Sequence, residues 1–382
     1  MEWVVARWLT FVATMLITGA GAVGLVFVPR VNSAATAVRD VARDAARMGI
    51  GAALVLFPAS LLRLTDQVLA LRSPGDALLS GLTPLLFSTT WGTGFLCQCA
   101  ASTVAGVGFA FARHTPRATW CWLLAALGAL GLCATPALQG HAIGSEESTV
   151  LAVAADIAHV IGASLWLGTL GVIAWLGVVL PNADGVVASE TAARADARLR
   201  ALVPLVPTVA LPGAALLLGS GVVASLLHLR DVSDLWREAW GRYVLAKFIL
   251  ACVIVALGAL NWRRLGPLMA TGASASSMRK SLLTELAIAL LILVITAVLV
   301  VTPLPGESDA ALRNRFESPT FVGPAGHREG PPSDAATCDM CDRETPTYLQ
   351  HRERETRIEI SAGSAAARPA ASSWLALTNP WA

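Results

Sequence analysis

Eight apolar runs, each long enough to cross a membrane as a helix, constrain this chain more than any other feature. A helix needs about 20 predominantly apolar residues to cross the hydrocarbon core of a bilayer. The runs occupy residues 8–28, 45–62, 82–111, 120–138, 150–176, 202–227, 243–260 and 282–301. They predict an all-α membrane protein, a bundle of about eight transmembrane helices.

The composition supports this class. Hydrophobic residues make up 55% of the chain and charged residues only 14%, whereas a soluble domain carries about 25% charged residues. The first run is interpreted as an uncleaved helix because further spans follow at once. No catalytic triad, phosphate-binding loop or dinucleotide fingerprint is present, so we do not expect an enzyme. The net charge is only +2 and the arginines lie mostly in loops, so we do not expect nucleic-acid binding.

Basic residues in the short loops predict the orientation, because cytoplasmic loops are enriched in Lys and Arg. One side carries most of them: Arg30, Arg39, Arg43, Arg47, Arg113, Arg117, Arg194, Arg198, Arg200, Arg263, Arg264, Arg279 and Lys280. The other carries Arg7, Arg63, Arg72, Arg230, Arg237 and Arg242. The first side is therefore predicted to be cytoplasmic, with both termini outside.

The chain divides by composition into three regions. Residues 1–139 form an N-terminal four-helix half, and residues 140–305 form a second four-helix region. Residues 306–382 are rich in Pro, Gly, Ser, Glu and Arg and contain few large apolar residues. Such a segment cannot bury enough apolar surface to fold, so we expect a disordered extracytoplasmic tail.

The fifth run contains an ionisable pair, Asp156 and His159. Three residues apart, they share one helix face, and His159 lies about 13 Å into the run at the helical rise. Ionisable groups at this depth normally face a bundle interior or a wet cavity. One interpretation is a structural hydrogen bond between the two side chains. The favoured one is a metal-handling histidine that Asp156 orients, with Trp166 packed beneath it.

Other histidines offer further ligands. His141 follows the fourth run, and a short loop joins it to the fifth, so both histidines are expected near the outer face. Two imidazoles suit copper, zinc or iron. His228, at the outer end of the sixth run, is either a third ligand or an ordinary interfacial histidine.

The tail carries one Cys-x-x-Cys pair, Cys338 and Cys341. A single pair does not encode a closed four-ligand zinc site. In an oxidising outer compartment a local disulfide is the default, and capture of a soft metal is the alternative.

Two charges near the ends of the last runs are interpreted as structural. Lys247 is expected to extend its ammonium toward the outer interface. Glu285 is expected to pair with Arg279 or with an arginine of the loop before it.

Several of these motifs together resemble the CopD (copper resistance protein D) family. The segments that carry the resemblance are Gly140-His141, the fifth-run sequence DIAHVIGASLWLG (156–168), Tyr243 to Lys247 followed by Asn261-Trp-Arg263, and Arg279-Lys280-Ser281 with Glu285. The resemblance covers residues 140–305, and the first three runs match by pattern alone. It implies a protein of copper homeostasis in the bacterial inner (plasma) membrane. Such a protein would act together with a periplasmic CopC-like copper-binding protein.

The resulting hypothesis is a copper transporter, with uptake favoured, in which His141 and His159 form an outer-half copper site. Two alternatives stay open. One is a membrane redox protein whose two histidines ligate a b-type haem, although haem normally requires histidines at matched depth. The other is a membrane assembly or signalling partner without transport activity, and the unusual tail is its main support.

Overall fold

The computed structural model describes residues 2–30, 35–71, 81–139, 149–179, 188–229, 231–261, 263, 276–300 and 302. All of them belong to the first of two compact units, Met1–Ser308. The second unit, Asp309–Ala382, lies outside the described residues, and so do Cys338 and Cys341.

Eight helices have the length and the apolar composition needed to cross a membrane, which confirms the predicted fold class. These helical spans are Val4–Phe27, Asp40–Leu71, Thr90–His114, Thr119–Gln139, Val150–Gly177, Asp196–Leu227, Ala239–Leu260 and Ser277–Leu299. The described residues contain no strand. The chain is a multi-pass membrane protein.

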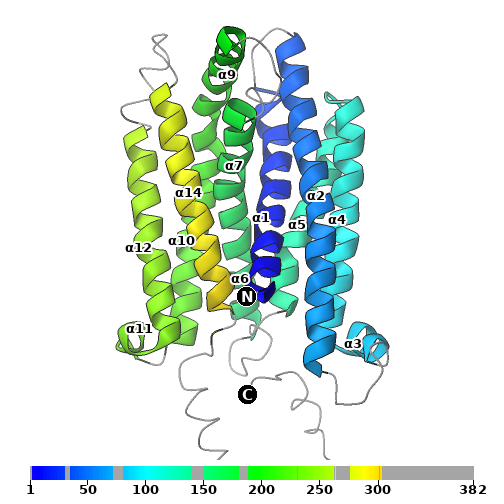
Figure 1. Ribbon diagram of the computed structural model, residues 1–382, viewed down its shortest axis with the longest axis vertical. Helices are drawn as coiled ribbons and strands as arrows, with labels where there is room; N and C mark the ends of the chain where they lie inside the picture. Colours follow the sequence, from blue (N-terminus) through cyan, green and yellow to red (C-terminus); the bar gives the residue numbers. More distant parts are fainter. Residues whose placement is uncertain are drawn as a thin grey trace, which may run out of the picture. The chain divides into compact units, whose positions relative to one another are not determined.

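The spans are built from α1 (Glu2–Ala22), α2 (Ala35–Leu71), α4 (Thr90–His114), α5 (Thr119–Gln139), α6 (Thr149–Ala163), α7 (Thr169–Ala174), α9 (Ala188–Leu202), α10 (Val206–His228), α12 (Ala239–Leu260) and α14 (Ser276–Leu299). Short helices α3 (Leu82–Ser88) and α11 (Asp234–Arg237) lie at one end of the bundle, and α9 lies at the other (Figure 1). A π-helical turn, Ser164–Gly168, joins α6 to α7.

Two spans differ from the sequence prediction. Helix α2 continues well beyond the predicted end of its run, and Pro58 lies inside it. The predicted third run instead divides at Thr89, which has an extended backbone (φ −120°, ψ 152°) and accepts a hydrogen bond from the Gly92 N–H as the N-cap of α4. Its hydroxyl satisfies one of the amides that a helix start leaves free. Hydropathy does not detect such a break because the residues on both sides are apolar.

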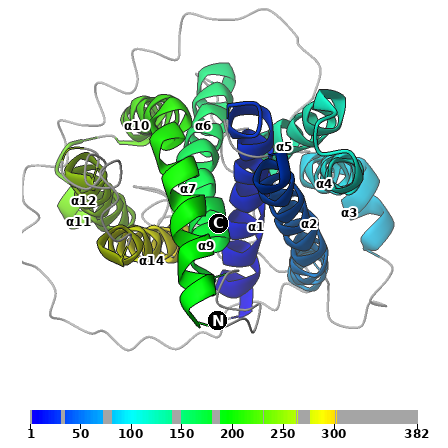
Figure 2. The same cartoon turned by 90° about the horizontal axis from the view of Figure 1, so that it is seen from above.

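The first helix, α1, occupies the centre of the bundle (Figure 2). It packs against α2 and α5 on one side and against α7, α14 and the π-helical turn on the other. Its closest approach is at Gly19, where an added Cβ would lie 2.2 Å from the carbonyl carbon of Gly168. Small residues allow such contact between membrane helices, where van der Waals packing drives association. Helix α1 therefore connects the first four spans to the last four.

A chain of buried hydrogen bonds connects α2, α4 and α5. The Gln98 amide, in a side chain 2% exposed, donates to Ser60 Oγ at 2.7 Å. Gln139 donates to Gln98 Oε1 at 3.2 Å, and the Ser60 hydroxyl donates to the Leu56 carbonyl at 2.7 Å. Buried polar groups in a bundle are stable when paired in this way.

We expect Gln98→Leu to destabilise the bundle by about 1–2 kcal/mol, because it leaves the Ser60 and Gln139 side chains without their partner in an apolar interior. The measurement is the thermal stability of the purified protein in detergent. Cys97→Ala is the matched control, since Cys97 is exposed on the same helix. Equal stability of Gln98→Leu and wild type would contradict a structural role for the chain.

Candidate functional site at the junction of α6 and α10

His159 lies in α6 and faces α10. Its Nδ1 atom is 3.1 Å from the Leu217 carbonyl oxygen and 3.4 Å from Ser220 Oγ. A carbonyl oxygen only accepts hydrogen bonds, so this contact favours the tautomer with the proton on Nδ1. That tautomer leaves the Nε2 lone pair for a ligand. Nothing in the sequence pattern indicated Leu217, because its contribution is a backbone carbonyl.

Close packing of α6 on α10 sets this geometry. A Cβ added to Gly162 would lie 2.4 Å from the Leu217 backbone nitrogen and 2.7 Å from the Gly213 carbonyl oxygen. Gly162 therefore lets the two backbones meet one turn from His159. The Ser220 hydroxyl donates to the Leu216 carbonyl at 2.6 Å, which fixes its oxygen on the His159 side of α10.

Gly162→Ala tests the importance of this spacing. The added methyl group meets backbone atoms that cannot rotate away, so it separates α6 from α10 and weakens the contact from His159 to Leu217. If His159 binds copper, as the sequence predicts, its copper affinity should fall about tenfold, the effect of losing a group that orients a histidine ligand. A copper-binding isotherm measures it. Gly219→Ala is the control, because a Cβ there meets nothing within 4 Å; equal losses in both variants would contradict the interpretation.

Two charged side chains share the junction. Asp156 and Lys247 are half-buried, and the Lys247 ammonium interacts electrostatically with the Asp156 carboxylate and with the His159 ring. Lys247 comes from α12, so three spans contribute to the junction. The sequence predicts that Lys247 extends toward the interface, but it gives no signal for the interaction with α6, because the helix neighbours cannot be derived from hydropathy. That Asp156 orients the His159 ring stays a prediction.

Trp166 lies within the π-helical turn, two helical turns beyond His159. Its side chain is 9% exposed and packs in a buried cluster with Met15, Ala210 and Ile254. The tryptophan therefore closes the bundle on the α7 side of the histidine. Insertion of a π-helical turn into a helix often accompanies a functional site, and hydropathy gives no signal for it.

Asn261 and Glu285 form a second polar contact, between the end of α12 and the start of α14. Asn261 donates to Glu285 Oε1 and accepts from the Ser281 hydroxyl at 2.8 Å. Glu285 is buried. We expected Arg279 or a loop arginine as its partner, and the structure adds Asn261, while Arg279 forms an ion pair with Asp196 of α9.

The remaining predicted ligands are not brought together by the described residues. His141 lies outside them, His228 ends α10 with an undescribed side chain, and Cys338 and Cys341 lie outside as well. Within the described ranges, no group of three or more His, Cys, Asp or Glu side chains is placed to hold a metal ion. That His141 and His159 together form a metal site stays a prediction.

An all-α bundle with eight membrane-crossing helices and a charged junction inside it defines a multi-pass membrane protein with a polar site between its spans. The sequence model described as Copper resistance protein D matches residues 201–299. The model described as Copper resistance protein D-like, N-terminal domain, matches residues 1–149. The chain belongs to the copper resistance protein D family. The segment between the two matches contains His159 and all but the last two residues of α9.

A curated relative is the Copper transport protein CutJ of Bacillus subtilis (strain 168). It is 26% identical over 225 residues, which is 58% of this chain and 38% of the relative. The chain thus aligns with well under half of the relative's length. No solved structure matched the chain.

Proposed function

We propose that this protein moves copper ions across the plasma membrane, with uptake the favoured direction, and that His159 is the copper ligand within the bundle. The observation that carries the proposal is the contact of His159 Nδ1 with the Leu217 carbonyl, 3.1 Å away, which favours the tautomer that keeps the Nε2 lone pair available to a metal ion. Membership of a copper resistance family supports copper as the ion.

The surrounding groups suit a transported cation. A neutral imidazole binds copper well, and an ion inside the bilayer needs compensating charge and polar contacts. Asp156 supplies a carboxylate at the junction, and Ser220 supplies a hydroxyl oxygen. The Lys247 ammonium interacts electrostatically with Asp156, which lowers the cost of keeping a carboxylate within a membrane.

The approach to His159 is assigned to the end of the bundle at which α6 begins. His159 lies about 15 Å from the first residue of α6, so His141, in the segment before that helix, would bind copper first and pass it inward. His228 at the end of α10 is a further candidate at this end. We place this end outside the cytoplasm, with both termini, where a periplasmic CopC-like protein or the Cys338–Cys341 pair would donate copper.

Reconstituted vesicles test the proposal. The purified full-length protein is placed in liposomes that enclose a copper-sensitive fluorescent chelator, and copper is added outside. We expect copper entry to be well above that of protein-free vesicles. We also expect the detergent-purified protein to retain copper and its visible spectrum to show no Soret band. Entry no faster than in protein-free vesicles would refute transport. A Soret band on the purified protein would instead assign the histidines to haem.

A further inference from the structure

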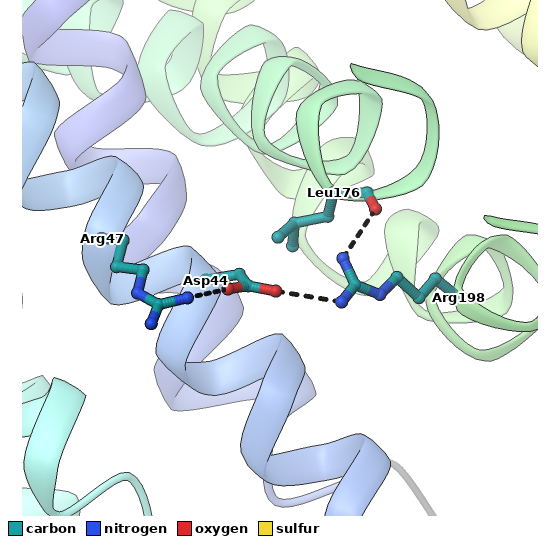
Figure 3. A network of polar contacts seen from close by, with 4 residues as sticks. All are labelled: Asp44, Arg47, Leu176 and Arg198. Carbon is teal, nitrogen blue, oxygen red and sulfur yellow. Dashed lines mark hydrogen bonds and ion pairs between the residues drawn. The ribbon is translucent and has the colours of Figure 1, made fainter. Parts of the chain in front are cut away.

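A buried carboxylate connects α2 to α9 at the end of the bundle opposite the start of α6. Asp44 Oδ2 lies 3.0 Å from an Arg198 guanidinium nitrogen, and Asp44 Oδ1 lies 3.0 Å from Arg47 (Figure 3). The Asp44 side chain is 9% exposed and that of Arg198 is 21% exposed. The same guanidinium donates to the Leu176 carbonyl at 3.3 Å. Arg198 thus ties α9 to the second and fifth spans.

A second ion pair on α9 reaches the last span. Asp196, two residues before Arg198, pairs with Arg279 of α14, and both side chains are about one-quarter exposed. We call these four residues, Asp44, Arg198, Asp196 and Arg279, the α9 latch. Asp44 belongs to the N-terminal family match and Arg279 to the second, so one short helix holds the two matched regions together at this end.

The latch lies next to buried apolar side chains and to a break in the regular helical hydrogen bonding. Leu199 and Leu202 of α9 are fully buried. The chain then passes through a short 3₁₀ turn, Val203–Leu205, into α10, and Pro204 and Pro207 interrupt the hydrogen bonding there. Helix α9 can therefore move about this turn without unwinding α10, whose Leu217 contacts His159.

The latch and the histidine lie at different depths. Leu176 is about 25 Å from His159 along the fifth span, at the helical rise. Between them, the Gly19–Gly168 contact and the Trp166 cluster close the bundle. On the proposed route, an ion that reaches His159 from the start of α6 passes this region and then the latch before it leaves. The Asp196–Arg279 pair is partly exposed, and such a pair suits a contact that opens repeatedly, because water screens its charges.

We propose that the α9 latch is the gate on the far side of His159: its ion pairs are closed in this structure and open, with α9 pivoting at the 3₁₀ turn, to release copper. This gate rests on the proposed transport function.

Cross-linking tests the gate. In the full-length protein, Asp196→Cys with Arg279→Cys is joined by a short, reducible bifunctional thiol reagent. We expect the joined protein to bind copper as wild type does but to transport it about tenfold more slowly or less, with recovery on reduction, since a closed gate blocks turnover and not binding. The two single-cysteine variants, treated alike, are the controls for native thiols. Transport by the joined protein at the control rate would overturn the gate.

Thiol labelling gives a second readout that does not depend on copper movement. Leu199→Cys is buried beneath the latch, and Ala197→Cys is an exposed control on the same helix. We expect Asp196→Asn to speed maleimide labelling of Leu199→Cys about tenfold, because labelling follows the open population, and to leave Ala197→Cys unchanged. The exchange of Asp196→Arg with Arg279→Asp should restore slow labelling.

Unchanged labelling of Leu199→Cys in the Asp196→Asn background would overturn the latch. If the unmodified protein moves no copper in vesicles, the proposed transport fails, and the labelling still decides whether the ion pairs control opening of this end. The two failures are therefore distinguishable.

Discussion

The His159→Ala variant is expected to lose copper binding and transport while the bundle stays folded. The substitution removes the imidazole and leaves the Leu217 carbonyl and the Ser220 hydroxyl, which bind copper poorly. We expect affinity to fall by about 100-fold or more, since losing a group that merely orients a ligand already costs about 10–100-fold. Copper content and the visible spectrum of the detergent-purified protein, compared with wild type, measure the loss.

His114→Ala is the matched control, because His114 is exposed in the last turn of α4 and far from the junction in the chain. It should retain wild-type copper. If His159→Ala fails to express or elutes as aggregate, the histidine is chiefly a packing residue held by α10. If it is well folded and retains copper, the assignment of His159 as the ligand is wrong.

The largest loss of stability is expected from Gly168→Val. A Cβ at this position would lie 2.0 Å from the Met15 carbonyl oxygen and 2.8 Å from its carbon, so the branched side chain meets backbone on α1. Overpacking costs about 1–3 kcal/mol where neighbouring side chains can move, and here the obstructing atoms cannot. We expect little folded protein, and a shortened half-life at fixed temperature for what is recovered.

Gly258→Ala provides the comparison, since nothing lies within 4 Å of a Cβ there. It should match or slightly exceed wild-type stability, because alanine favours the helix. The half-life is measured by size-exclusion chromatography after heating. Wild-type stability of Gly168→Val would show that α1 and the π-helical turn are not in close contact in the folded protein.

Much of the fold was predictable from the sequence because hydrophobic length reports directly on membrane crossing. The positions of the eight spans follow from it, to within a few residues at most ends. The break at Thr89 and the extension of α2 past its apolar run were not predicted. Both depend on local hydrogen bonding and on polar residues at the ends of the apolar runs. The mean hydropathy of a run does not report on either.

The site was predictable only in part. Asp156 and His159 stand out because ionisable residues are rare inside an apolar run, and spacing alone places them on one face. The partners from other helices were not accessible in the same way. Leu217 contributes a carbonyl, which every residue has, and Lys247 approaches from a span whose position depends on packing. Asp44 and Arg198 are 154 residues apart in the chain, so their pairing has no local sequence signal.

The central place of α1 has a consequence for how the protein is made. The first helix enters the membrane long before its partners α7 and α14 exist, and its glycine face has nothing to pack against until the π-helical turn is synthesised. Native contacts between the two ends of the chain must therefore form late, with a large entropic cost of loop closure. Until the fifth and eighth spans are made, the side of α1 that contacts α7 and α14 has no helix partner, although its other side can already pack against α2 and α5. The bundle is thus complete only when the later spans that carry α7 and α14 have packed against α1.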